Sequence, residues 1–179
     1  METLNRVSVD VAEMYSPPKV TTTAKDMGMR PGEAFDITTG WDFRREEDRR
    51  RALQYVKDKP KLLVGSPMCI MFSRLQQLTP WTEEKQRRWC EAREHIKFVI
   101  EIYREQLDNG RWFLHEHPAA ATSWDLNEID GLAKEKGVSI SIIDQCMYGL
   151  KTWGGRSRIS ARKATKFMSN CPAIGRRLT

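Results

Sequence analysis

A long amphipathic segment between two short apolar runs constrains this fold most. Within residues 82–109, apolar side chains recur at steps of three and four, which predicts a helix. Thr82 can cap its start, and Asn109-Gly110 can end it. The flanking runs, KLLVGS at 61–66 and RWFLH at 111–115, are typical of buried strands. A strand, a crossover helix and a second strand predict two parallel strands of one sheet.

The rest of the chain continues this alternation of strands and helices. Further strands are expected at residues 7–15, 33–38, 138–143 and 164–168, and further helices at 20–26, 46–58 and 126–136. Residues 151–163 are basic, contain Gly154-Gly155 and predict a loop. The pattern predicts an α/β fold with a mostly parallel sheet and helices on both faces. The 179 residues fit one domain, residues 1–179.

Charge and composition indicate which partners and which cellular location to expect. The net charge of +6 suits a nucleic acid, with DNA expected, although a solvated basic surface explains the charge equally well. No apolar run approaches the roughly 20 residues that cross a bilayer, so no membrane association is expected. The N-terminal residues lack the apolar core of a signal peptide, which favours an intracellular location. The four cysteines form no CxxC pair, so we expect free thiols and no zinc site.

Cys69 lies in GSPMCIMFS, residues 65–73, just past the end of an expected strand. In open α/β sheets, ligands bind outside the carboxyl ends of the strands, so this thiol would lie where a reaction occurs. The alternative is a structural cysteine, which is the commoner role of a lone buried thiol.

Glu116 follows the next expected strand, in WFLHEHP at residues 112–118. A partly desolvated carboxyl at a strand end can serve as a proton donor. The alternatives are a surface salt bridge or a helix cap. We interpret His115 and His117 as local hydrogen-bonding residues and predict no metal site.

Together, a cysteine and an acid on neighbouring strand ends suit one reaction. Cytosine C5 is a poor nucleophile until a thiolate adds to C6, and an acid at N3 assists that addition. The activated C5 can then accept a methyl group from a sulfonium donor. The separation of 116 − 69 = 47 residues leaves room for one crossover helix between the two strands.

Six short motifs, in order, resemble those of the cytosine-5 DNA methyltransferases, above all the compact phage-type members. They are VAEMYS (11–16), AFDITTGWDF (34–43), GSPMCIMFS (65–73), HEHP (115–118), DQCMYG (144–149) and RKATKFMSN (162–170). The resemblance implies a Rossmann-like methyltransferase fold. No separate target-recognition domain is visible in the 179 residues, which departs from the family, so we expect a compact single domain. It also implies that Cys69 is the nucleophile and that Glu116 assists at N3.

The resemblance further implies S-adenosylmethionine as the cofactor. The expected cofactor pocket is bounded by Glu13, Tyr15, Ser16, Asp36 and Pro67, with a volume of roughly 300 Å³ or more. The expected substrate-binding residues are Ser73, Arg156, Arg158, Arg162 and Lys163, although the basic residues equally suit a solvated loop. Pro17-Pro18-Lys19 stands where the family has a glycine-rich cofactor turn. The alternative hypothesis is therefore a catalytically inactive module of the same fold that binds nucleic acid or a partner protein, as in a phage or mobile element.

Overall fold

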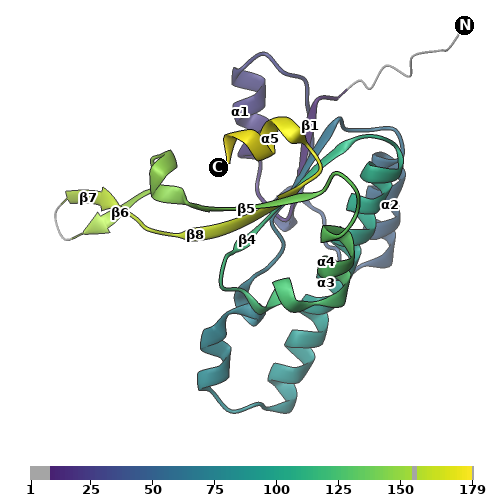
Figure 1. Ribbon diagram of the computed structural model, residues 1–179. Coiled ribbons are helices and arrows are strands. Elements are labelled where there is room, and N and C mark those ends of the chain that lie inside the picture. Colours follow the sequence, from purple (N-terminus) through teal and green to yellow (C-terminus); the bar gives the residue numbers. More distant parts are fainter. Residues whose placement is uncertain (1–8, 155–156, 179) are drawn as a thin grey trace, which may run out of the picture.

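A six-stranded sheet forms the centre of the computed structural model, which describes residues 9–154 and 157–178 (Figure 1). Its strands, in spatial order, are β2 (Pro31–Phe35), β1 (Val11–Met14), β3 (Leu62–Gly65), β4 (Trp112–Pro118), β8 (Ala164–Ser169) and β5 (Ser139–Asp144). The first four strands are parallel, and β8 is antiparallel to both of its neighbours. The protein is thus mixed α/β with a mostly parallel sheet, as predicted.

Five α-helices accompany the sheet in the described part of the chain. They are α1 (Val20–Asp26), α2 (Glu46–Val56), α3 (Glu83–Asp108), α4 (Asn127–Ala133) and α5 (Pro172–Arg177). The sequence did not predict α5. The predicted long helix is confirmed as α3, and the Thr82 side chain accepts a hydrogen bond from the backbone N–H of Lys85 at its start.

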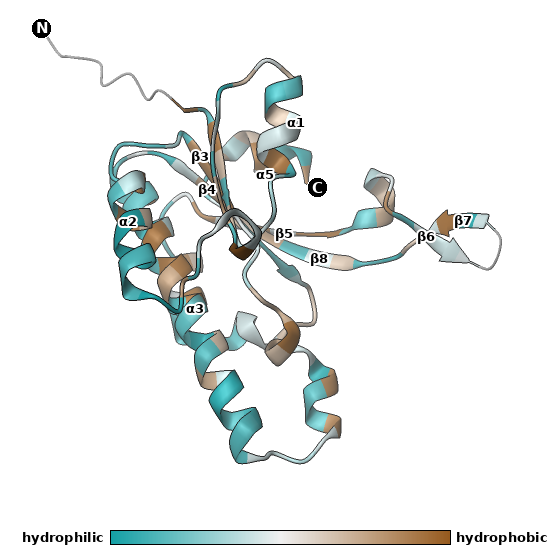
Figure 2. Cartoon of the chain, turned by 180° about the vertical axis from the view of Figure 1, so that it is seen from behind, coloured by the Kyte–Doolittle hydropathy of each residue, from teal (hydrophilic) through white to brown (hydrophobic). Residues whose placement is uncertain are grey.

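The two faces of the sheet are covered by different helices. Along β1, Ala12 and Met14 join the main core with α2 and α3, whereas Val11 packs with Ala24 of α1 on the other face. This alternation follows from the two-residue period of a strand. The strands at the centre of the sheet are mostly hydrophobic, and the outer side of α3 is hydrophilic (Figure 2). Helix α5 contacts β5 and β8.

Several elements differ from their predicted boundaries. Strand β2 spans Pro31–Phe35 rather than residues 33–38, and Ile37–Thr39 form a short 3-10 helix after it. Strand β4 runs to Pro118 rather than ending at residue 115, because residues 114–118 pair with the antiparallel strand β8. Glu116 therefore lies within the strand, opposite Phe167. Residues 151–163, expected as a loop, instead contain β6 (Lys151–Gly154) and β7 (Ser157–Ser160), which form a separate antiparallel pair. Of the first expected strand, residues 7 and 8 lie outside the described residues.

Candidate functional site

The strand order reverses between β1 and β3. From β1 the chain builds β2 on one side, and it later returns to place β3 on the other side. Ligands of open α/β sheets bind in the crevice at such a point, outside the carboxyl ends of the strands. Met14 and Gly65 are register partners at these ends, and the backbone N–H of Ser66 donates to the Met14 carbonyl at 3.1 Å. The segments that follow β1 and β3 therefore begin side by side.

Tyr15, the first residue after β1, has a left-handed backbone with φ of 59°. For a residue with a Cβ, this conformation costs about 1–2 kcal/mol. The ring is held by Phe43, with centroids 5.1 Å apart, and its Oη lies 3.0 Å from Nδ1 of His95. Burial raises the pKa of Tyr15 and lowers the pKa of His95, so both groups are neutral at pH 7. The turn after β1 is thus anchored through its side chain.

A hollow of about 230 Å³ opens beside Tyr15, at the ends of β1 and β2. It is lined by Tyr15, Phe35, Asp36, Ile37, Trp41, Asp42, Phe43, Arg44, Met68, Glu91 and His95. Two of the expected cofactor residues, Tyr15 and Asp36, are among them. Ser16 and Pro67 adjoin lining residues in the chain without lining the hollow. Its volume is below the roughly 300 Å³ expected of a small-molecule pocket.

Asp36 presents a half-buried carboxylate to this hollow. Its Oδ1 accepts hydrogen bonds from the backbone N–H of Thr38 at 2.9 Å and from the Thr38 hydroxyl at 2.6 Å. Within residues 9–154 and 157–178, Oδ2 has no hydrogen-bond partner. One oxygen therefore shapes the turn after β2, and the other can bind a ligand hydroxyl.

Glu13 has a different position from the one expected. Its side chain is fully buried, and it accepts hydrogen bonds from the Thr21 backbone N–H at 2.8 Å, the Thr21 hydroxyl at 2.6 Å and the Val20 N–H at 3.3 Å. The carboxylate thereby satisfies backbone donors at the start of α1. Glu13 does not line the hollow, and we interpret it as an anchor for α1.

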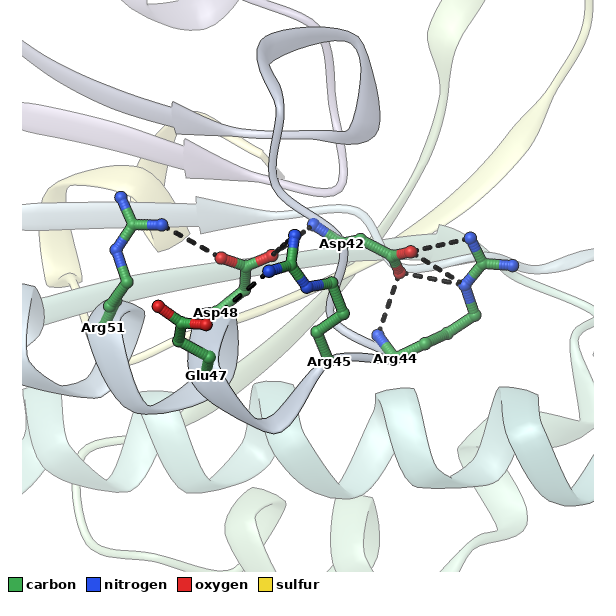
Figure 3. Close-up of polar contacts among 6 residues, drawn as sticks. All are labelled: Asp42, Arg44, Arg45, Glu47, Asp48 and Arg51. Atoms are coloured by element: carbon green, nitrogen blue, oxygen red, sulfur yellow. Dashed lines mark hydrogen bonds and ion pairs between the residues drawn. The ribbon is translucent and has the colours of Figure 1, made fainter.

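A network of carboxylates and arginines fixes the segment that carries Asp42 and Arg44, two residues that line the hollow (Figure 3). The buried Asp48 side chain accepts hydrogen bonds from the backbone N–H of Asp42 at 3.2 Å and from Arg51 Nη1 at 3.0 Å. Asp42 is in turn hydrogen-bonded by Arg44, which lowers the pKa of Asp42 to about 2. These contacts connect the start of α2 to the loop that carries Trp41.

Cys69 borders a second hollow, of about 540 Å³. The lining residues are Cys69, Ile70, Ser73, Arg74, Leu75, Gln76, Pro118, Ala120 and Ala121. They combine the segment after β3 with the segment after β4. Ser73, an expected substrate-binding residue, is among them. Since Met68 lines the first hollow and Cys69 the second, this short segment separates the two. The thiol is half-buried, and all four cysteines are free.

Glu116 lies on β4, the parallel neighbour of β3, one residue beyond the pair formed by Gly65 and His115. Its side chain is 20% exposed, and Oε1 lies 3.7 Å from Nζ of Lys163, an expected substrate-binding residue. That same Oε1 is buried and makes no hydrogen bond in the described structure. A buried oxygen without a hydrogen bond is uncommon in folded proteins and marks Glu116 as a functional candidate.

His117 contributes a contact that the sequence did not predict. Its Nε2 lies 2.9 Å from the carbonyl oxygen of Pro67, and its Nδ1 lies 2.6 Å from Oγ of Ser123. The sequence predicted only local hydrogen bonds for His117, but Pro67 lies 50 residues away in the chain. His117 thereby connects the strand of Glu116 to the segment of Cys69.

The remaining expected substrate-binding residues are spread over the segment between β6 and β8. Arg158 lies on β7, and Arg162 pairs with Asp144 at 3.0 Å. Arg156 lies outside the described residues. Only Lys163 joins Glu116 at the sheet. No group of three potential metal ligands occurs among the described residues.

The fold and site define an α/β protein with a mostly parallel sheet, a hollow at the carboxyl ends of its strands and a cysteine on the neighbouring segment. No protein-family model matches the chain, and a search of curated proteins found no match. None of the helices in the described part of the chain is both long and apolar enough to cross a membrane.

Proposed function

We propose that this chain is an S-adenosylmethionine-dependent methyltransferase with a Rossmann-like fold that acts on cytosine C5 in DNA. The observation that carries the proposal is the position of the segment Met68-Cys69 between two hollows. One hollow suits the adenosine part of a cofactor, and the other suits a substrate base beside the thiol. Glu116 on the adjacent parallel strand supplies the acid.

The first hollow combines groups suited to the adenosine part of the cofactor. Phe35, Trp41 and Phe43 present aromatic surface for a purine ring. The available oxygen of Asp36 can accept a hydrogen bond from a ribose hydroxyl. The volume of about 230 Å³ suits this part of the cofactor rather than the whole molecule. When bound, S-adenosylmethionine would supply an electrophilic methyl group.

Cys69 and Glu116 would activate the cytosine ring together. The Cys69 thiolate adds to C6, forming an S–C6 bond, and the displaced electron pair moves toward C5. Glu116 gives a proton or a hydrogen bond to N3, which stabilises the developing charge. Once C5 has gained the methyl group, loss of the C5 proton returns the electron pair. The S–C6 bond then breaks, and the thiolate is regenerated.

The second hollow would receive a base that is not stacked on its neighbours. Chemistry on a stacked base is blocked, so the target cytosine must lie in a single strand or be extruded from a duplex. Ile70 supplies apolar surface for its ring, and Ser73 and Gln76 supply polar groups. This arrangement favours a nucleobase over a small apolar substrate.

A second candidate function is a non-catalytic module of the same shape that binds nucleic acid or a partner protein. The contacts of Glu13 favour it. A phosphate or carboxylate ligand often binds at a helix start that follows the first strand. Here the protein's own carboxylate bonds to the first N–H groups of α1, and Pro17-Pro18 precede that helix.

Trapping with a fluorinated substrate separates these two functions. The wild-type protein, with S-adenosylmethionine, is incubated with DNA that contains 5-fluorocytosine. Fluorine at C5 blocks the elimination step, so a catalytic thiol stays covalently attached to the strand. We expect an adduct with the wild type and none with Cys69→Ser. Cys90→Ser, which changes an exposed cysteine on α3, is the matched control and should form the adduct.

The adduct is detected as a shifted band on a denaturing gel, with mass spectrometry to identify the attached peptide. A folded wild-type protein that binds the DNA but forms no adduct would contradict the catalytic proposal and favour the binding module. An adduct on Cys90 or Cys146 would contradict the role of Cys69.

A further inference from the structure

Strands β6 and β7 form a two-stranded ribbon that projects away from the body of the protein (Figure 1). It continues outward from β5 and β8 as a separate sheet. Its side chains are exposed along both strands. A ribbon with so little buried surface contributes little to the core, and its side chains are available for contact with a partner.

The register divides the ribbon into two unlike faces. Directly opposed residues of an antiparallel pair share a face. Lys151 pairs with Ser160, and Trp153 pairs with Arg158, which places both cations and the indole on one face. The other face carries only Thr152, Gly154, Ser157 and Ile159. We name the first face, made of Lys151, Trp153, Arg158 and Ser160, the basic face.

Charge around the basic face is strongly one-sided. The described residues of the segment 139–169 contain five Lys or Arg and one acidic residue, Asp144, which gives 5 − 1 = +4. Asp144 is paired with Arg162, and it lies on β5 rather than on the ribbon. Within the described residues, Lys151 and Arg158 have no carboxylate partner. A polyanion therefore complements this face.

Trp153 indicates which polyanion. Its side chain is 70% exposed, and the Arg158 guanidinium lies 5.8 Å from the centre of its ring. An exposed indole flanked by cations is the combination with which proteins stack an unpaired base and hold its phosphates. The bases of a duplex are already stacked on one another and do not offer a free ring face to an indole.

We propose that the basic face binds a single-stranded segment of DNA, with a base stacked on Trp153 and the neighbouring phosphates on Lys151 and Arg158. The inference rests on the proposed function, because it names the strand form of the substrate. Binding by this face needs neither Cys69 nor the cofactor, so the two proposals can fail separately.

The test is fluorescence anisotropy with a labelled mixed-sequence DNA strand and its duplex. We expect the wild type to bind the single strand more tightly. Trp153→Ala should weaken single-strand binding roughly 5- to 150-fold, the effect of losing one stacked base. Trp153→Phe keeps an aromatic ring and should recover part of the affinity. Thr152→Ala, on the opposite face of the same strand, is the matched control and should bind as the wild type does.

A salt series tests the phosphate contacts. Each lost contact should lower the slope of log affinity against log salt by about 0.7 for a single strand. We expect this change with Lys151→Ala and with Arg158→Ala. Arg50→Ala, which removes an exposed cation from α2, should leave the slope unchanged.

Three results would overturn the inference: unchanged single-strand affinity in Trp153→Ala, tighter binding of the duplex by the wild type, or no binding of either form at low salt. Cys69→Ser should bind the strand as tightly as the wild type. If no adduct forms on fluorinated DNA while the ribbon variants lose affinity, the catalytic proposal fails and this one holds. If an adduct forms and the ribbon variants bind normally, the reverse is true.

Discussion

Nε2 of His117 donates a hydrogen bond of 2.9 Å to the carbonyl oxygen of Pro67. Burial lowers the pKa of His117 to about 4, so the ring is neutral at pH 7. With its proton on Nε2, the ring has an acceptor at Nδ1, which accepts a hydrogen bond from the Ser123 hydroxyl, with Nδ1 and Oγ 2.6 Å apart. The chain Ser123–His117–Pro67 thus fixes the segment that leads to Cys69 against the strand that carries Glu116.

His117→Ala should loosen that segment. The Pro67 carbonyl loses its donor, and a cavity replaces the ring, so we expect a loss of about 1–3 kcal/mol in the free energy of unfolding. Urea unfolding measures it. Alkylation of Cys69 should also become faster, measured in a Cys90→Ser and Cys146→Ser background. His117→Asn keeps a donor and should show smaller effects on both measures. An unchanged alkylation rate in His117→Ala would contradict the positioning role.

Stability should fall as the pH falls below about 6.5. Burial lowers the pKa values of His95, His115 and His117, so between pH 6.5 and about 4 the unfolded chain binds protons that the folded chain does not. For His117 alone, the shift from 6.5 to about 4 corresponds to about 3 kcal/mol, fully lost below pH 4. Urea midpoints between pH 7.5 and 4.5 measure the slope. His117→Asn should flatten it, and a profile identical to the wild type would contradict this assignment.

Gly65→Ala should destabilise the end of β3. A Cβ there would overlap Oη of Tyr103 and lie 2.9 Å from its Cζ, and Tyr103 is fully buried. We expect a loss of about 1–3 kcal/mol from this overpacking, measured by thermal or urea unfolding. The Tyr103→Phe change removes Oη and should recover part of the loss in the double variant.

Gly131→Ala is the matched control for that substitution. Gly131 lies inside α4, and a Cβ there would come no closer than 3.5 Å to Arg104 Nη2. Alanine favours a helix over glycine, so this variant should be up to about 1 kcal/mol more stable. Equal effects of the two substitutions would show that the contact with Tyr103 does not decide the outcome.

Asp36→Asn should weaken S-adenosylmethionine binding. The amide oxygen can still accept from Thr38, which preserves the turn, but the charge available to a ribose hydroxyl is lost. A hydrogen bond to a charged group contributes about 1.5–3 kcal/mol, so we expect a roughly 10- to 100-fold rise in Kd by calorimetry. Asp26→Asn, at the exposed end of α1, should leave Kd unchanged. Equal Kd values for Asp36→Asn and the wild type would contradict a cofactor role for this carboxylate.

Local patterns in the sequence predicted the alternating strands and helices of the main sheet well. The three- and four-residue spacing of apolar side chains predicted α3, because one face of a long helix must be buried. The apolar run at 61–66 predicted β3, and the turn residues around it placed Cys69 past the strand end. The same logic failed for β6 and β7. Their strands bury no face, so the sequence carries no alternation of apolar and polar residues to reveal them.

The sequence by itself therefore determined the α/β class, the parallel order of strand, helix and strand, and the position of Cys69 beyond a strand end. Each of these follows from residues close together in the chain. Only the tertiary structure decided that β4 extends to Pro118, that Lys163 pairs with Glu116 and that His117 holds Pro67. These contacts join residues about 50 apart. Their partners are selected by packing and strand register, which no local spacing records.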